Sequence, residues 1–538
     1  MTSLNLADGD PTQSTVDAVV VGVFGSGDGA LTLAPGAESV ADAFEKHGSL
    51  VDAVRRLGAT GAAGEVTKLA TFGAINAPVL AAVGLGPEPA HDESTGAGPI
   101  SSKNDAVPLE SGRLTAGSAS LRPLASGVPA ETLRRAAGAA TRALAGSDRV
   151  VLALPGPLRP VAEGALLGAY RFAGYKTRPS TDRRDPVRTV SLGIGGDAAA
   201  KRAGRAELKR ATTVAGAVAR ARDWVNTAPN DLRPPAFADE IAAAAEKAGL
   251  DVEVLDERAL RRGGYGGILA VGLGSSAPPR FVRLAYAPRG AKKRLALIGK
   301  GITFDTGGLS IKPAANMWEM KSDMSGAAAV AAATIAIAAL APKVAVTAYV
   351  PIAENMPSGT SYRPGDVVTM RDGSRVEVLN TDAEGRMILA DGITRAVEDG
   401  ADYLLETSTL TGGQIIALGK KVSGLMGDED FCARVRDVGA RVGEPAWPMP
   451  LPDDVRKGMD SEVADLSQVD SGMGRAGHML QGGVFLSHFV PEDLPWAHLD
   501  IAGPAYNAGE PTGYLPKGGT GVPVRTLIEL ADDIAVNG

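Results

Sequence analysis

Short apolar, β-branched runs alternate with longer amphipathic segments through the first third of the chain. The strand-like runs cover residues 17–24, 79–84, 150–154 and 189–194, and the helix-like segments cover residues 130–145 and 163–175. Alternating strand and helix patterns are typical of α/β domains. The pattern therefore predicts a small N-terminal α/β domain over residues 1–195, and we find no catalytic constellation in it.

A second and longer alternation occupies residues 196–538. Its strand-like runs cover residues 252–255, 281–287, 295–299, 344–351, 376–379, 403–407 and 497–501, and its helix-like segments cover residues 237–248, 325–340 and 384–398. Apolar strands separated by helices predict a mostly parallel sheet with helices on both faces. We therefore expect a larger C-terminal α/β domain that carries the chemistry.

Residues 86–127 interrupt the regular pattern of the first domain. This segment is rich in Pro, Ser and Gly and shows no hydrophobic period. Such a composition does not bury enough apolar surface to form a core. We predict a mobile insertion here.

Composition and charge narrow the class of protein. Hydrophobic residues make up 44% and charged residues 22% of the 538 positions, as in soluble globular proteins. The net charge of -7 argues against a general binder of nucleic acid or of anionic membranes. The single cysteine, Cys432, excludes an intrachain disulfide and fits a reducing compartment.

Targeting and membrane segments are not expected. Residues 1–15 carry acidic residues and no basic region of the kind that begins a secretory signal. The longest apolar run, residues 327–341, is shorter than the roughly 20 residues that span a bilayer. We predict a cytoplasmic protein in which this run is a buried helix.

Charged residues gather after two predicted strands, at the sheet edge where open α/β folds bind ligands. They are Lys300, Asp305 and Lys312 after strand 295–299, Asp382, Glu384 and Arg386 after strand 376–379, and Asp323 at the start of the Ala-rich helix. Taken singly, each has a structural explanation. Asp323 is placed to cap a helix, Asp382 to form an Asx turn, and Glu384 to favour a helix N-terminus. The lysines are equally explained as solvated surface charges.

The carboxylates are harder to explain together. If their segment is extended, Asp382 and Glu384 point the same way because they are two residues apart. Carboxylates that converge repel each other unless a cation lies between them or one is protonated. Divalent metals supply that charge, and ligation by oxygen suits Mg, Mn or Zn. The sequence therefore predicts an acidic metal site.

The positions of the histidines argue against other kinds of catalytic site. The five histidines are His47, His91, His478, His488 and His498, and none lies among these carboxylates in the sequence. There is no His-Glu-x-x-His zinc motif, and the region holds no Walker A loop and no Gly-x-Ser-x-Gly elbow. Nucleophilic catalysis is also disfavoured, because Thr306, Ser310 and Cys432 have no histidine near them in sequence.

The segment Asn380-Thr-Asp-Ala-Glu-Gly-Arg386 resembles the signature of the leucyl aminopeptidase family, also called cytosol aminopeptidases. Other segments also resemble sequences of this family, namely residues 299–308, 320–326, 351–357, 409–412 and 496–503. The resemblance extends from about residue 210 to the C-terminus and is weak over the first 200 residues. It implies an enzyme that releases N-terminal residues, often leucine, from peptides, as a homohexamer of two-domain subunits.

The resemblance also implies roles for the site residues. One of two divalent metals would bind Lys300, Asp305, Asp323 and Glu384, and the other would bind Asp305, Asp382 and Glu384, with Mn or Zn expected. Lys312 and Arg386 would be catalytic, the latter holding a bicarbonate that shuttles protons. Met320, Thr409 and Gly412, with Met479 as a further candidate, would line the pocket for the first side chain of the substrate. Core packing explains Met320 and Met479 equally well.

Two departures from the family pattern concern the surroundings of the site. Thr306 stands where many members have Ser, and residues 470–478 depart from the usual small-residue pattern. The difference at residues 470–478 leaves open which side chain of the substrate the pocket prefers.

Three alternatives remain at this point. A metal-dependent phosphoesterase would use a similar carboxylate cluster. Some bacterial members of the family have an additional DNA-binding regulatory role, which the acidic charge balance disfavours here. An inactive scaffold is the third, although all seven predicted ligands and catalytic residues are present.

Overall fold

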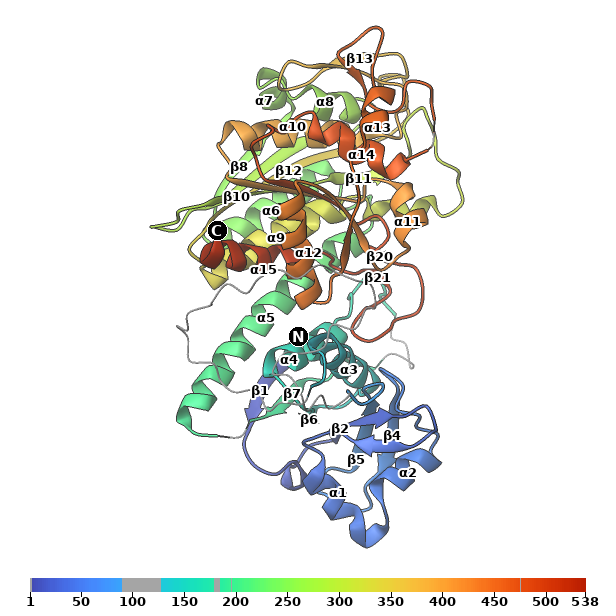
Figure 1. Ribbon diagram of the computed structural model, residues 1–538, viewed down its shortest axis with the longest axis vertical. Helices are drawn as coiled ribbons and strands as arrows, with labels where there is room; N and C mark the ends of the chain where they lie inside the picture. The colour runs from blue at the N-terminus through green and yellow to red at the C-terminus, as the bar shows by residue number, and fades with distance from the viewer. Residues whose placement is uncertain (1, 90–126, 179–183, 195, 475) are drawn as a thin grey trace, which may run out of the picture. The chain divides into compact units, whose positions relative to one another are not determined.

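The computed structural model describes residues 2–89, 127–178, 184–194, 196–474 and 476–538. The chain divides into two compact units (Figure 1). Unit 1 comprises Met1–Ala169, Ser180–Thr212 and Thr512–Tyr514, and unit 2 comprises Tyr170–Pro179, Thr213–Pro511 and Leu515–Gly538. Both are α/β, so the predicted fold class is confirmed. The predicted insertion at 86–127 lies almost entirely outside the described residues.

A seven-stranded, mostly parallel sheet forms the centre of unit 1, in the order β1-β7-β6-β2-β5-β4, with β3 paired to β2. The strands are β1 (Ser3–Ala7), β2 (Ala18–Gly25), β3 (Leu31–Leu33), β4 (Val66–Ala70), β5 (Val79–Gly84), β6 (Arg149–Ala153) and β7 (Thr189–Gly193). The helices are α1 (Glu38–Phe44), α2 (Leu50–Arg56), α3 (Ala130–Ala143) and α4 (Leu158–Gly168).

Strand β2 shows why this sheet is covered on both faces. Val20 packs in one hydrophobic cluster with Leu133 of α3, whereas Val19 packs in a second cluster with Val40 of α1. Successive side chains of a strand point to opposite faces, so an uninterrupted apolar run requires a core on each side.

The predicted helix 163–175 differs from the observed α4, which begins and ends earlier. Pro160 lies in its first turn, where a missing backbone N–H costs no hydrogen bond. The helix therefore starts at Leu158 and ends at Gly168. The long helix α5 (Ala198–Asn226) follows, with residues up to Thr212 in unit 1 and the rest in unit 2.

The nine-stranded sheet of unit 2 has the order β17-β16-β19-β15-β10-β12-β9-β8, with β11 paired to β12. Its strands are β8 (Asp251–Leu255), β9 (Arg280–Tyr286), β10 (Arg294–Gly299), β11 (Gly301–Asp305), β12 (Ala345–Asn355), β15 (Tyr403–Ser408), β16 (Ser423–Gly427), β17 (Ala446–Pro448) and β19 (Trp496–Asp500). The central strands β19, β15, β10 and β12 are parallel, and β8, β9 and β16 join antiparallel.

Helices cover both faces of this sheet. They are α6 (Pro234–Lys247), α7 (Glu257–Arg262), α8 (Gly266–Gly272), α9 (Ser325–Leu340), α10 (Glu384–Glu398), α11 (Gly412–Leu418), α12 (Glu429–Arg441), α13 (Asp453–Gly458), α14 (His478–Ser487) and α15 (Val524–Asn537). Residues of α8, α10 and α14 share one core cluster with β10 and β15. The segment Met317–Leu340 is apolar and long enough to cross a membrane, but it is mostly buried inside the fold, as a core helix of an α/β unit is.

One predicted strand is wrongly placed. The run 376–379 contributes to β14 (Arg375–Glu377), which belongs to a separate three-stranded sheet with β13 (Val367–Thr369) and β18 (Leu466–Ser467). An apolar run does not reveal which strand it pairs with, so the pattern assigned it to the main sheet.

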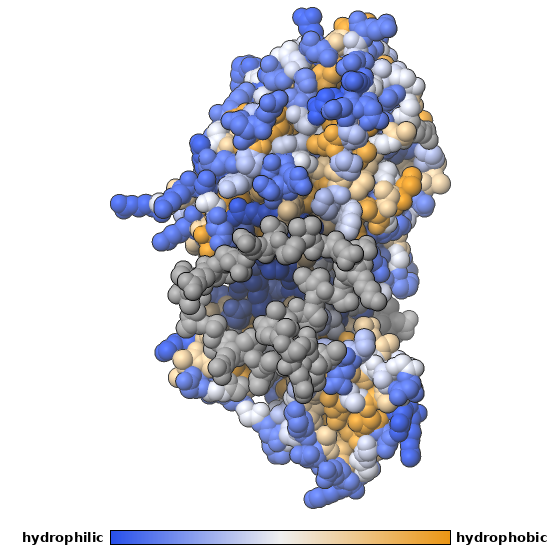
Figure 2. All heavy atoms as spheres, viewed as in Figure 1, coloured by the Kyte–Doolittle hydropathy of each residue, from blue (hydrophilic) through white to orange (hydrophobic). Residues whose placement is uncertain are grey.

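The visible face of the molecule carries many hydrophilic side chains with apolar ones in separate groups (Figure 2).

Glycines allow the first turn of α9 to lie directly on the sheet. A Cβ at Gly326 would stand 2.2 Å from the Thr407 carbonyl oxygen, and one at Gly299 would stand 2.5 Å from the Gly326 carbonyl oxygen. Neither position has room for a side chain. This close packing fixes the ends of β10 and β15 against the segment that contains Asp323.

Candidate metal centre

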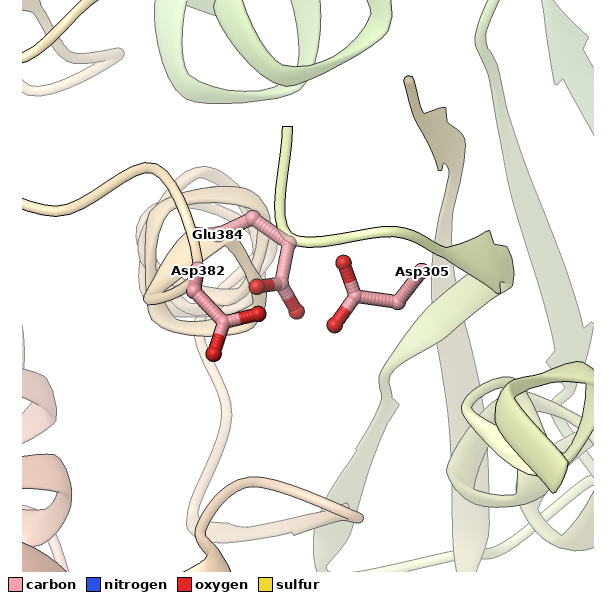
Figure 3. A group of neighbouring side chains, drawn as sticks. All are labelled: Asp305, Asp382 and Glu384. Carbon is pink, nitrogen blue, oxygen red and sulfur yellow. The ribbon is translucent and has the colours of Figure 1, made fainter. Parts of the chain in front are cut away.

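Segments that carry the predicted site residues meet at the carboxyl ends of the parallel strands. Lys300 follows β10, Asp305 ends β11, and Asp382 and Glu384 lie at the start of α10. The oxygens offered by Asp305, Asp382 and Glu384 all lie within 4.8 Å of one another. Figure 3 shows the three carboxylates pointing toward a common centre.

The route to this convergence differs from the one expected. The segment is not extended: Asp382 lies in a turn, and Glu384 is the first residue of α10. Asp382 and Glu384 therefore meet because a helix begins between them, which the two-residue spacing alone did not reveal.

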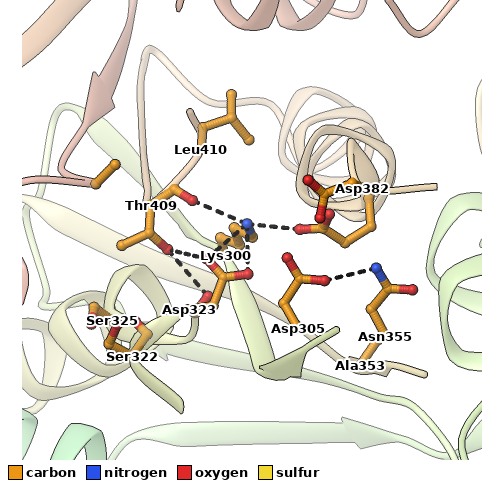
Figure 4. A network of polar contacts seen from close by, with 12 residues as sticks. Lys300, Asp305, Ser322, Asp323, Ser325, Ala353, Asn355, Asp382, Thr409 and Leu410 are labelled. Carbon is orange, nitrogen blue, oxygen red and sulfur yellow. Dashed lines mark hydrogen bonds and ion pairs between the residues drawn. The ribbon is translucent and has the colours of Figure 1, made fainter. Parts of the chain in front are cut away.

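Lys300 connects the remaining carboxylate to the cluster. Its buried ammonium lies 2.8 Å from an oxygen of Asp323 and 2.8 Å from one of Glu384, and it donates to the Thr409 carbonyl at 3.0 Å (Figure 4). Burial lowers the pKa of Lys300, but Asp323, Glu384 and Asp305 outweigh it, so the pKa is raised. Lys300 is an ammonium in this arrangement and not a solvated surface charge.

Lys312 occupies the other side of the cluster. Its ammonium lies 2.7 Å from an oxygen of Asp305 and also pairs with Asp382. Burial lowers its pKa, and the surrounding carboxylates, Asp305 first, raise it by more. Two lysines thus supply part of the positive charge that the carboxylates need.

The carboxylates remain electrostatically crowded despite these lysines. Burial raises the pKa of Asp323 to about 8, with Lys300 opposing the change. Burial also raises the pKa of Asp382 to about 7, with a further increase from Asp305. Oxygen Oε2 of Glu384 is buried and accepts no hydrogen bond from any described residue. A cluster of carboxylates with an unused buried oxygen has the chemistry that divalent cations bind.

The structural explanations for two acids do not hold. The N-cap of α9 is Met324 and has no side-chain hydrogen bond, so Asp323 does not cap this helix. In the turn before α10, the Asx-type bond comes from Asn380, whose side chain accepts from the Asp382 amide at 2.9 Å.

Arg386 lies in the first turn of α10 and is 2% exposed. It donates to the backbone carbonyl of Gln468. Burial lowers the pKa of Arg386 to about 10, while Glu384 and Asp500 act to raise it. The guanidinium is thus a buried cation beside the acidic cluster.

A cavity of about 590 Å³ opens onto Lys312 and Asp382. Met320 and Gly412 line it, as do Val469, Met473 and His478. Thr409 is not among its lining residues. The Thr409 hydroxyl instead donates to Asp323 at 2.7 Å, so in this structure it supports the acidic cluster.

Two family models match the chain. The catalytic-domain model of the cytosol aminopeptidase family matches residues 219–528, and the N-terminal-domain model of the same family matches residues 20–179. The chain belongs to the cytosol aminopeptidase family. It is therefore a peptidase, and the sequence resemblance is confirmed and extends into the first 200 residues, where the motifs alone were weak.

Relatives named "Probable cytosol aminopeptidase" agree over most of the chain. The one from Streptomyces avermitilis is 47% identical over 541 residues, covering 99% of this chain and 98% of the relative. The one from Nocardia farcinica is 55% identical over 410 residues, covering 76% and 80%. A solved structure, the bottromycin maturation enzyme BotP in complex with Mn, is 33% identical with a TM-score of 0.78, covering 96% of this chain and 99% of that one.

Sequence reasoning missed Asn355, which supports the centre of this cytosol aminopeptidase. Its fully buried amide donates to Asp305 at 2.8 Å and to the Thr381 carbonyl at 3.0 Å. The signal was its position at the end of β12, but the predicted strand stopped at residue 351, four residues before Asn355.

Asn355→Ala is expected to weaken binding of Mn to the metal-free protein by roughly 10- to 100-fold, the usual effect of removing a residue that orients a ligand. Titration calorimetry measures the affinity, and circular dichroism checks the fold. Asn230→Ala, at an exposed asparagine, is the matched control. Equal affinities for the two variants would contradict a supporting role for Asn355.

Proposed function

We propose that this cytosol aminopeptidase is a two-metal enzyme that removes N-terminal residues, leucine and other apolar residues first, from peptides. The observation that carries the proposal is the convergence of Asp305, Asp382 and Glu384 around one point, with an unpaired oxygen on Glu384. The ligands proposed for two divalent ions, Mn or Zn, are Lys300, Asp305, Asp323, Asp382 and Glu384. The similarity to BotP, solved in complex with Mn, supports a divalent metal here.

Metals bound there would make a water more acidic and polarise the scissile carbonyl. Lys312 lines the cavity and pairs with Asp305 and Asp382. As a cation at that position, it would stabilise the negative charge that develops on the carbonyl oxygen of the substrate. Lys300 would give up its proton to become a ligand, since an ammonium has no lone pair to offer.

Arg386 is the proposed anchor for a bicarbonate that moves protons, because it is a cation beside the acidic cluster. Met320 and Gly412 line the cavity in which the first side chain of the substrate would lie. The lining includes the apolar side chains of Met320 and Val469, which supports a preference for leucine-like side chains. A cytoplasmic homohexamer is proposed from the family resemblance.

Chelation followed by metal restoration tests this function directly. We expect the metal-free protein to release no p-nitroaniline from leucine p-nitroanilide, and activity to return on addition of Mn or Zn. Failure of both metals to restore activity would remove the two-metal proposal. Activity on p-nitrophenyl phosphate in its place would favour the phosphoesterase alternative, and retardation of DNA in a gel-shift assay would favour the additional regulatory role.

A substrate with a blocked amine tests whether cleavage depends on the free N-terminus. N-acetyl-leucine p-nitroanilide differs from the substrate only in its blocked amine, which removes the positive charge and the free lone pair. We expect hydrolysis of this compound to be slower by about 100-fold or more, because proper placement of the first residue is lost. Equal rates on the two compounds would contradict cleavage directed by the free amine.

A further inference from the structure

A buried carboxylate that the proposed mechanism does not use lies at the end of β19. Asp500 is fully buried. Its oxygen Oδ1 accepts from the backbone amides of Leu410 at 3.2 Å and Ala502 at 3.1 Å, and its oxygen Oδ2 accepts from the Thr411 hydroxyl at 2.7 Å. Two of these three bonds hold the loop Thr409–Gly412.

Both ends of that loop belong to the candidate site: its start contacts proposed metal ligands, and its end lines the cavity. At its start, the Thr409 carbonyl accepts from Lys300 and the Thr409 hydroxyl donates to Asp323. At its end, Gly412 begins α11 and lines the cavity. Thr411 also accepts from the amide of Gln414, so it joins Asp500 to the first turn of this helix. A shift of the loop would therefore move Lys300, Asp323 and the cavity wall together.

Two other buried ionisable residues, Glu406 and His498, lie near Asp500 in the sheet. His498, two residues earlier on β19, points to the same face and pairs with Glu406, its neighbour on β15. The pKa of His498 is lowered by burial, but Glu406 and Asp500 outweigh this and raise it. Glu406 and Asp500 thus both favour the protonated form of His498.

We propose that Asp500 is a positioning residue for this site: through its bonds to Leu410 and Thr411 it fixes the loop Thr409–Gly412. The inference rests on the proposed function for its effect on catalysis, but the order of the loop and the affinity for metal depend on Asp500 whatever the substrate is.

Asp500→Asn separates charge from shape. Asparagine retains an oxygen for the amides of Leu410 and Ala502, whereas its NH₂ group would force the Thr411 hydroxyl to accept instead of donate. We expect kcat on leucine p-nitroanilide to fall on the order of 10- to 100-fold, as for a misplaced catalytic group, with KM within about threefold. Faster hydrogen exchange over residues 409–414 and weaker Mn binding should accompany the loss.

Leu499→Val is the matched control, since Leu499 is the buried neighbour of Asp500 on β19 and points to the opposite face. It should leave kcat, KM and loop exchange unchanged. An equal fall in kcat for both variants, or a fall in Asp500→Asn that matches only its unfolded fraction, would overturn the proposal in favour of a merely structural role.

A second pair of variants keeps the test decisive if Asp500→Asn does not fold. Thr411→Val removes one bond to Asp500, and Thr411→Ser restores the hydroxyl. We expect faster loop exchange and lower kcat in the first and recovery of both in the second, whereas identical behaviour would overturn the proposal. If the wild-type protein releases no p-nitroaniline, the proposed function fails, but loop exchange and Mn affinity still decide the role of Asp500.

Discussion

Glu384→Gln is expected to lower kcat/KM on leucine p-nitroanilide by about 10³-fold or more, equivalent to about 4 kcal/mol of transition-state stabilisation. Glutamine keeps the size of the side chain but not its charge. Glu384 belongs to the three-carboxylate cluster and also contacts Lys300 at 2.8 Å. The substitution therefore weakens the binding of metal and the orientation of a neighbouring ligand at once.

Steady-state kinetics and the metal content of the purified variant check this result together. Glu398→Gln is the control, because Glu398 lies at the other end of α10, is exposed and pairs with Arg371. It should retain wild-type activity. Glu384→Gln with more than a tenth of the wild-type activity and a full complement of metal would remove Glu384 from the site.

Lys312→Met should have the second largest effect, a fall in kcat on the order of 10² to 10³, the typical result of losing a group that stabilises an oxyanion. Methionine fills a similar volume without charge. The Lys312 ammonium pairs with Asp305 and Asp382. Removing it should therefore leave Mn affinity unchanged or higher, because an internal competitor for these oxygens is gone.

The combination of lower kcat and undiminished metal affinity distinguishes Lys312 from the ligands. Stopped assays give kcat, and titration calorimetry on the metal-free variant gives the affinity. Lys312→Arg retains the charge and should recover part of the rate. A variant Lys312→Met that loses metal affinity instead would assign Lys312 a structural role in holding Asp305 and Asp382.

Much of the fold follows from local pattern. The apolar run 17–24 predicts a strand of an α/β domain, and the Ala-rich run of α9 predicts a buried helix; both are found. The pairing of strands that lie far apart in the sequence was harder to predict. The run near residue 376 has strand propensity, but it pairs with β13 and with β18, about 90 residues later in the chain, and so leaves the main sheet.

The site was predictable to the extent that its residues are charged and follow strands. All seven predicted ligands and catalytic residues lie near the carboxyl ends of the parallel strands of unit 2. Their individual roles stay predictions. The supporting roles of Asn355, Glu406 and Asp500 were not predicted. Asn355 and Asp500 lie in segments that resemble the family, but a single sequence does not reveal which side chains these segments bring into contact. Glu406 and His498 meet only because β15 and β19 are neighbours, and strand order is a property of the whole sheet.

The lysines that pair with the acidic cluster have a consequence for folding and for metal binding. Lys300 and Lys312 balance two of the four carboxylates, and the raised pKa values of Asp323 and Asp382 let these acids keep protons near neutrality. We therefore expect the chain to fold without metal, unlike small zinc domains, which are unfolded without it. Binding of the proposed metals would then release the protons held by these acids, so we expect metal affinity to rise with pH.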